Sequence, residues 1–133
     1  MSPSISLILD DVVRVHVQGQ MLLLNLRDIV AIRSRENYSL IHFADERITK
    51  VRIPLKAWIE GLPDTAFLRV HRTTLVNRRR LLGVRYLGPK KWALGVDGLA
   101  RPVPVGRLYW RQVREDLACV SGPVEERLVR QPA

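Results

Sequence analysis

The sequence predicts a single all-β domain built mainly from antiparallel strands. Short apolar runs recur about every ten residues and are separated by turn-forming residues, which is typical of antiparallel sheets. The pair Asp97-Gly98 is typical of a two-residue hairpin turn, because Asp and Gly tolerate positive φ angles. Between these runs no helix of a dozen residues is expected, whereas parallel strands need such crossover helices. A chain of 133 residues has the length of one domain.

The first expected strand spans residues 13–17, where three valines alternate with polar side chains, and Gln18-Gly19 is expected to form the turn after it. Arg27-Asp28 separates the next two strands, and Gly88-Pro89 marks a later break. A hairpin is expected around residues 44–46. The remaining expected strands are 21–26, 29–32, 38–43, 47–53, 67–76, 81–87, 92–96 and 100–105.

Two helices are expected in addition to the strands. The internal one begins at Pro54 and ends at Gly61, which leaves room for about two turns. The C-terminal one spans about residues 107–119, where apolar residues recur at four-residue spacing. These apolar residues are Tyr109, Val113 and Leu117.

The chain divides into three parts by composition. We expect residues 1–11 to form an N-terminal extension, residues 12–118 to form the folded domain, and residues 119–133 to form a disordered tail. The tail contains two prolines, mixed charges and few apolar residues. Only about a dozen residues precede the first expected strand.

Three features favour a cytoplasmic protein with no membrane insertion. The single cysteine, Cys119, cannot form an internal disulfide, which fits a reducing compartment. The N-terminus lacks the basic region of a signal peptide. The longest apolar runs are far too short to span a bilayer.

Positive charge is concentrated in one segment of the chain. The net charge is +9, yet residues 1–68 contain eight basic and eight acidic residues. Residues 69–114 contain twelve basic residues and one acid, Asp97. Eighteen of the 22 basic residues are arginines, so compositional bias is the alternative explanation, but such a bias would not spare residues 1–68. A basic segment on a neutral scaffold favours a polyanionic partner.

The most informative motif runs from Phe67 to Arg80. If residues 67–76 form one strand, Arg69 and His71 share one face and Arg72 lies on the other. Asn77 and the three arginines after it are then expected on a loop, where recognition groups concentrate. Asn77 suits a bidentate contact with adenine but also suits a turn. The arginines suit phosphate groups but could also be simply solvated.

Two further segments carry clustered cations. The turn that contains Arg33, Arg35, Asn37 and Tyr38 offers guanidinium, amide and phenol groups, although Glu36 would repel phosphate and an ordinary hairpin loop explains it almost as well. In the C-terminal helix, basic residues recur at i, i+4 and i+7 and share one face. Cations near a helix start are unfavourable for the helix dipole, which hints at a partner anion. These residues are Arg107, Arg111, which could instead pair with Glu115, and Arg114.

Catalysis finds little support in the sequence. Adjacent acidic residues occur only in turns or at exposed ends, without the spacing of acid–base pairs or metal ligands. The histidines stand in separate strands with no cysteine or glutamate cluster. No glycine-rich phosphate loop is present. We therefore expect no enzyme activity, metal or cofactor. The histidines are His16, His42 and His71.

Four segments occur in an order typical of one family. They are DIVAIRSRENYSLIHF, VRIPLKAWIEGLP, FLRVHRTTLVNRRRLLGV and RPVPVGRLYWRQVREDL. Over residues 12–118 the chain thereby resembles the LytTR family of DNA-binding domains, the output modules of many bacterial response regulators. The third segment is the most specific, since an apolar strand leads to HRT and then to a Val-Asn pair. The chain departs from the pattern at Gly106, where serine is common. We also expect no phosphorylated receiver domain before this module, which implies either a separate regulatory protein or none.

The resemblance implies an elongated, mainly antiparallel fold whose loops enter successive major grooves of duplex DNA. Matching positions imply base contacts by Asn37 or Tyr38, by Asn77 and by Arg107. The cationic motifs predict contacts with phosphate groups. All of these residues are expected to converge along a single edge of the domain. The expected phosphate contacts are Arg33, Arg35, Arg72, Arg78, Arg79, Arg80 and Arg111.

The sequence therefore predicts a bacterial transcription regulator that binds duplex DNA in a sequence-specific manner, as a homodimer on repeated half-sites. Two alternatives belong to other classes. A β module for a cyclic dinucleotide could use the arginine run, but no D-x-S-x-x-G motif follows it. A single-stranded RNA binder would need aromatic stacking platforms, and aromatic residues are only 6% of the chain.

Overall fold

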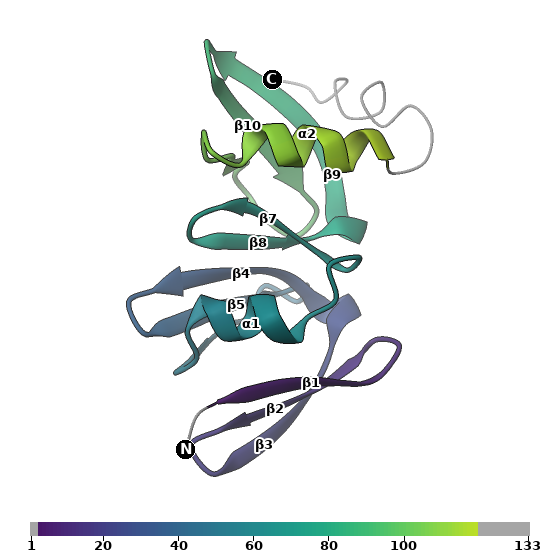
Figure 1. The fold of residues 1–133 in the computed structure, drawn as a ribbon, viewed down its shortest axis with the longest axis vertical. Coiled ribbons are helices and arrows are strands. Elements are labelled where there is room, and N and C mark those ends of the chain that lie inside the picture. The colour runs from purple at the N-terminus through teal and green to yellow at the C-terminus, as the bar shows by residue number, and fades with distance from the viewer. Residues whose placement is uncertain (1–2, 120–133) are drawn as a thin grey trace.

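The computed structural model describes residues 3–119, which form three antiparallel sheets stacked along the long axis of the molecule (Figure 1). The N-terminal sheet contains β1 (Ser4–Leu9), β2 (Val12–Val17) and β3 (Gln20–Asn25). The central sheet contains, in spatial order, β6 (Ile48–Val51), β5 (Tyr38–Phe43), β4 (Ile29–Arg35), β8 (Thr74–Asn77) and β7 (Phe67–His71). The C-terminal sheet contains β11 (Val103–Pro104), β10 (Lys91–Val96) and β9 (Leu81–Gly88).

Two α-helices and two short 3-10 helices complete the fold. The predicted helices are confirmed as α1 (Leu55–Gly61) and α2 (Trp110–Cys119). Each 3-10 helix connects one sheet to the next. The first, η1 (Leu26–Asp28), leads from β3 to β4, and the second, η2 (Arg78–Arg80), leads from β8 to β9. The predicted all-β class with one internal and one C-terminal helix is confirmed.

The central sheet is buried on both faces by two hydrophobic cores. On one face, Ile29 and Ile32 of β4 pack in a core with residues of the N-terminal sheet and α1. On the other face, Val30 and Ala31 pack in a core with residues of the C-terminal sheet and α2. All four residues of β8 are buried as well. Because both faces are covered, these strands read as continuous apolar runs and not as alternating patterns.

Helix α1 is fixed to the central sheet by a buried hydrogen-bond chain. The indole Nε1 of Trp58, which is fully buried, donates to the Ser39 hydroxyl at 3.0 Å. That hydroxyl in turn donates to the carbonyl of Ile53, just before the helix. The buried indole N–H of Trp58 and the buried Ser39 hydroxyl therefore both have partners, as buried polar groups require.

The N-terminal residues belong to the folded domain. We expected the first strand at Val13, but β1 pairs with β2 in an antiparallel register that places Ile5 opposite Val15. Ile5 also packs against Gly61 of α1, where a Cβ would lie only 2.6 Å from the Ile5 carbonyl oxygen. The alternation of polar and apolar residues in this strand, Ser4-Ile5-Ser6-Leu7, is short and is lost at Ile8-Leu9.

The expected single strand over residues 67–76 is wrong, because a tight turn divides it into β7 and β8. The Nδ1 atom of His71 accepts a hydrogen bond from the Thr73 amide at 3.2 Å and lies 3.0 Å from the Thr73 hydroxyl. A guanidinium nitrogen of Arg69 donates to the Arg72 carbonyl at 2.9 Å. Side chains thus stabilise a turn that contains no glycine or proline.

The structure also bears on one predicted turn, one predicted strand and the predicted tail. The turn at Gln18-Gly19 is confirmed, with φ angles of 49° and 77°. The strand expected at residues 100–105 is reduced to β11, which pairs with β10. The expected tail, residues 119–133, lies outside the described residues apart from Cys119, which ends α2.

Candidate nucleic-acid interface

Three segments far apart in the sequence meet at one edge of the central sheet (Figure 1). They are the β4–β5 turn, the β7–β8 turn and the segment that leads into α2. The Ser34 amide donates to the Thr73 carbonyl at 2.8 Å. The Gly106 amide donates to the Val70 carbonyl, also at 2.8 Å. Main-chain hydrogen bonds therefore connect the three segments, and we call this edge the basic edge.

Close packing holds the segment before α2 against the β7–β8 turn. A Cβ at Gly106 would lie 3.0 Å from Cδ2 of Tyr109 and 3.4 Å from Cδ2 of His71, so a larger residue would push these rings aside. The guanidinium of Arg69 lies 5.2 Å from the centre of the Tyr109 ring, in a cation–π contact. The glycine that departs from the family pattern therefore permits this close approach.

The cations of the basic edge lack acidic partners. Arg35, Arg72 and Arg107 are exposed and Arg33 is half-buried, and within residues 3–119 none of the four forms an ion pair. Arg111 lies 3.7 Å from Glu115, but both side chains are largely exposed, so this contact is weak. Charges of one sign without internal partners leave the edge electrostatically suited to an external anion.

The tip of the β4–β5 turn presents further polar groups. Asn37 is exposed, while the half-buried ring of Tyr38 lies 4.3 Å from the Lys50 ammonium and 6.0 Å from the Arg52 guanidinium. Lys50 and Arg52 thus extend the basic edge, although we did not single them out from the sequence. The signal was available, because the predicted β5–β6 hairpin places Lys50 opposite Leu40, near Tyr38.

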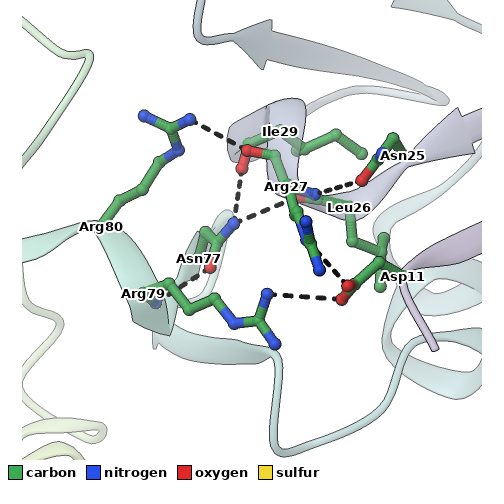
Figure 2. Close-up of polar contacts among 8 residues, drawn as sticks. All are labelled: Asp11, Asn25, Leu26, Arg27, Ile29, Asn77, Arg79 and Arg80. Carbon is green, nitrogen blue, oxygen red and sulfur yellow. Dashed lines mark hydrogen bonds and ion pairs between the residues drawn. The ribbon is translucent and has the colours of Figure 1, made fainter.

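Asn77 does not lie on this edge, and its predicted base contact is wrong. Its side chain is only 3% exposed. Its amide nitrogen donates to the carbonyls of Leu26 at 3.1 Å and Ile29 at 2.9 Å, and its Oδ1 accepts from the Arg79 amide at 3.0 Å (Figure 2). These three bonds occupy most of the capacity of the amide, so Asn77 has a structural role.

Asn77 and Asn25 form equivalent caps. Asn25 precedes η1 and accepts from the Arg27 amide at 2.9 Å, as Asn77 precedes η2 and accepts from the Arg79 amide. Both caps have extended backbone conformations. Of these two asparagines, Asn77 is the buried one, and its side-chain amide also bonds to the other 3-10 helix, at Leu26.

Each arginine of the η2 run has an internal partner. Arg78 lies 3.4 Å from Asp116 of α2 and donates to the Asp64 carbonyl at 2.8 Å. Arg79 lies 3.4 Å from Asp11 (Figure 2). Arg80 lies 3.7 Å from Asp97 and donates to the Arg27 carbonyl. The run therefore connects the central sheet to the β1–β2 turn, to the C-terminal sheet and to α2.

The expectation of a single edge is therefore wrong for residues 77–80. Strand β8 begins at Thr74, opposite Arg33 at the basic edge, and ends at Asn77, opposite Phe67. At about 3.3 Å per residue, Asn77 lies about 10 Å along the strand from Thr74. In Figure 1 the η2 segment after β8 lies on the side opposite the β7–β8 turn. The structure brings together at the basic edge Arg33, Arg35, Asn37, Tyr38, Arg72 and Arg107.

One titratable group on β5 of the central sheet, His42, has a perturbed pKa. Burial lowers the pKa of His42 below its ordinary value of 6.5, and the nearby Arg33 guanidinium lowers it further. The imidazole is therefore neutral at physiological pH. Its Nε2 atom is buried and has no hydrogen-bond partner within residues 3–119.

Residues 3–119 contain no group of three His, Cys, Asp or Glu side chains that could hold a metal ion. Over the same residues, neither helix has the length and apolar character to cross a bilayer.

Comparisons with known proteins agree with the geometry. Residues 19–118 match the family model for the LytTr DNA-binding domain. The fold is similar to the LytTr DNA-binding domain of a protein from Bacillus cereus described as a methyl-accepting/DNA response regulator. That similarity has a TM-score of 0.65 and 18% identity, and covers 80% of this chain and 95% of that one. The comparison with curated proteins gives no match. Because the family model matches most of the chain, the protein belongs to the LytTr family, which is a family of DNA-binding domains and not of enzymes.

Proposed function

We propose that this protein is a transcription regulator that recognises a specific duplex DNA sequence by inserting the turns of its basic edge into the major groove. The observation that carries this proposal is the convergence of three cationic segments, connected by the Ser34–Thr73 and Gly106–Val70 hydrogen bonds. Membership of a DNA-binding family supports DNA as the polyanion. The major groove suits such turns, because it presents a distinct donor and acceptor pattern for each base pair.

The side chains divide into two roles by their position and chemistry. Arg107 and Asn37 are exposed at the ends of their segments and carry groups that suit guanine and adenine edges. Tyr38 supports Asn37 from the same turn. The remaining arginines, which flank these groups, neutralise phosphates and set the orientation on the duplex. The phosphate contacts proposed are Arg33, Arg35, Arg72 and Arg111.

The proposed assembly on DNA is a pair of protomers on repeated half-sites. One protomer offers three short turns, which read only a few base pairs, and a second protomer doubles the length of sequence that is read. We assign any control of DNA binding to a separate regulatory protein. The stoichiometry of complexes on duplexes with one or two half-sites tests the pairing.

The central experiment is selection of bound fragments from random duplexes at two ionic strengths, followed by affinity measurements on the selected sequence. Four phosphate contacts predict a slope of about −4 for log K against log salt concentration. Arg107→Ala should lower the affinity ratio between the selected and random sequences, whereas Arg72→Ala should weaken both alike. Arg14→Ala, on the outer face of the N-terminal sheet, is the control. Selection that enriches no sequence would overturn the proposal.

A further inference from the structure

A second cationic feature lies beside the basic edge, between the β9–β10 hairpin and the start of α2. Two hollows of about 370 and 470 Å³ adjoin there, and both are lined by Lys90, Trp92 and Arg107. Because they share these three residues, the two hollows are neighbours, and we call them together the hairpin groove. Its other lining residues are Leu87, Pro89, Lys91, Pro104, Val105, Leu108 and Trp110.

The lining of the hairpin groove has one sign of charge. Lys90, Lys91 and Arg107 contribute three cations, and no acidic residue is among the residues of the described chain, 3–119, that line it. Both lysines are exposed, and within residues 3–119 neither forms an ion pair. Three cations around the groove repel one another, and a bound anion relieves this repulsion.

The wall of the groove is rigid. The rings of Trp92 and Trp110 stack with centroids 4.4 Å apart and an interplanar angle of 8°. Tyr86 packs edge-on against Trp92 at 5.0 Å. This aromatic stack joins the hairpin to the first turn of α2, so that Lys90 and Arg107 are held on elements with a fixed relative position. Lysine stems and indole rings together form a surface that can exclude water from an anion.

The rim of the groove contains an unusually exposed apolar residue. Leu108, next to Arg107, is 93% exposed and is the most exposed large hydrophobic residue in the described part of the chain. It makes almost no contribution to either core. A ligand that lies across the groove would cover it.

The position of the groove identifies the anion. Arg107 belongs both to the basic edge and to the groove, so the two surfaces are continuous. The β9–β10 hairpin extends past α2 at the end of the molecule opposite the N-terminal sheet (Figure 1). An anionic chain that lies along the basic edge therefore continues over the groove. Two neighbouring, open hollows suit a chain of phosphates better than one small anion.

We propose that the hairpin groove binds the sugar-phosphate backbone of the DNA segment that flanks the base contacts, with Lys90 and Lys91 each neutralising one phosphate. The inference rests on the proposed function and adds a contact that extends the site beyond the three turns. The lysine ammonium groups act as mobile point charges, which suits contacts that carry no base information. The groove thereby lengthens the duplex that one protomer covers.

The test compares two double variants that remove the same charge. Lys90→Gln with Lys91→Gln removes the groove lysines. Arg14→Gln with Lys56→Gln removes two exposed cations of the N-terminal sheet and α1, far from the groove. Both should retain the wild-type urea midpoint. Salt-dependent affinity and hydroxyl-radical footprints are measured for both variants and for the full-length wild type on the selected duplex.

The slope of log K against log salt concentration should be smaller in magnitude by about 2 for the groove variant than for the wild type, since each phosphate contact contributes about 0.9. Its deficit in affinity relative to the wild type should therefore shrink about 3.5-fold when the salt concentration doubles. One flanking set of protected sugars should disappear from its footprint, while the control keeps it. Equal slopes and footprints for the two variants, with intact wild-type binding, would overturn the groove alone. Absence of a wild-type complex would overturn the proposed function as well.

Discussion

The side-chain amide of Asn77 donates a 2.9 Å hydrogen bond to the carbonyl of Ile29, 48 residues earlier in the chain. This bond joins the end of β8 to the start of β4, at the end of the sheet away from the basic edge. The same amide bonds to Leu26, and its oxygen caps η2. Because this one buried amide bonds to η1, to the start of β4 and to η2, it fixes how the N-terminal sheet leads into the central one.

Asn77→Ala should therefore reduce stability and not sequence discrimination. It removes the hydrogen bonds to the Leu26 and Ile29 carbonyls and the cap of the Arg79 amide, which together should lower the free energy of unfolding by about 2–4 kcal/mol. Asn25→Ala removes only the equivalent cap at an exposed site and should cost about 1 kcal/mol. Urea unfolding of both variants measures the difference. An Asn77→Ala protein with wild-type stability and lost sequence preference would contradict the structural role.

The bond between Trp58 and Ser39 gives a second prediction about stability. Ser39→Ala leaves the buried indole N–H of Trp58 without an acceptor, which should cost about 1–3 kcal/mol. In the background of Trp58→Phe, which has no N–H, the same change should cost less. A double-mutant cycle by chemical unfolding should thus give a coupling energy above about 0.5 kcal/mol. Additive effects would show that the bond contributes nothing.

His42 should make stability depend on pH. Burial and Arg33 lower its pKa in the folded state, whereas the unfolded chain should have the ordinary value of 6.5. As pH falls through that value, the unfolded state binds a proton that the folded state does not, so the free energy of unfolding decreases. The decrease ends once pH is below the folded pKa. His42→Gln should reduce the slope of the urea midpoint between pH 7 and pH 5, and an unchanged slope would refute this assignment.

Most strands, both helices and two of the three segments of the basic edge could be predicted from the sequence, but β1, the division between β7 and β8 and the place of Asn77 could not. Hydrophobic periodicity carries no information about a turn that is held by the side chains of His71 and Thr73. That missed turn reverses the chain direction. A single strand over residues 67–76 would have ended at the edge where β7 ends, whereas β8 returns the chain to the opposite edge. Because this hairpin was not predicted, Asn77 and the three arginines after it were all expected at the wrong end of the central sheet.

The burial of β4 on both faces explains why its packing partners could not be predicted from the sequence. Its first four residues contact two different cores, so no alternation marks which side faces which sheet. Propensity and pattern predict that such a strand exists, but the partners on each face depend on the sheet order, which arises only from long-range pairing. For the same reason the partners of Arg78, Arg79 and Arg80, which lie in three separate parts of the chain, could not be predicted locally.

The separation of the two arginine clusters gives the last prediction. Arg72 lies on the basic edge with no ion pair within residues 3–119, whereas Arg79 lies at the opposite edge and pairs with Asp11. Arg72→Gln should therefore reduce the magnitude of the salt slope of DNA binding by about 0.9, because one phosphate contact is lost. Arg79→Gln removes the same charge and should leave the slope unchanged, with a loss of stability below about 1 kcal/mol. Affinity for the selected duplex, measured over a range of about fourfold in salt concentration, gives both slopes. If Arg79→Gln had the larger effect, the DNA would have to cross the η2 edge, and the basic edge would not be the binding surface.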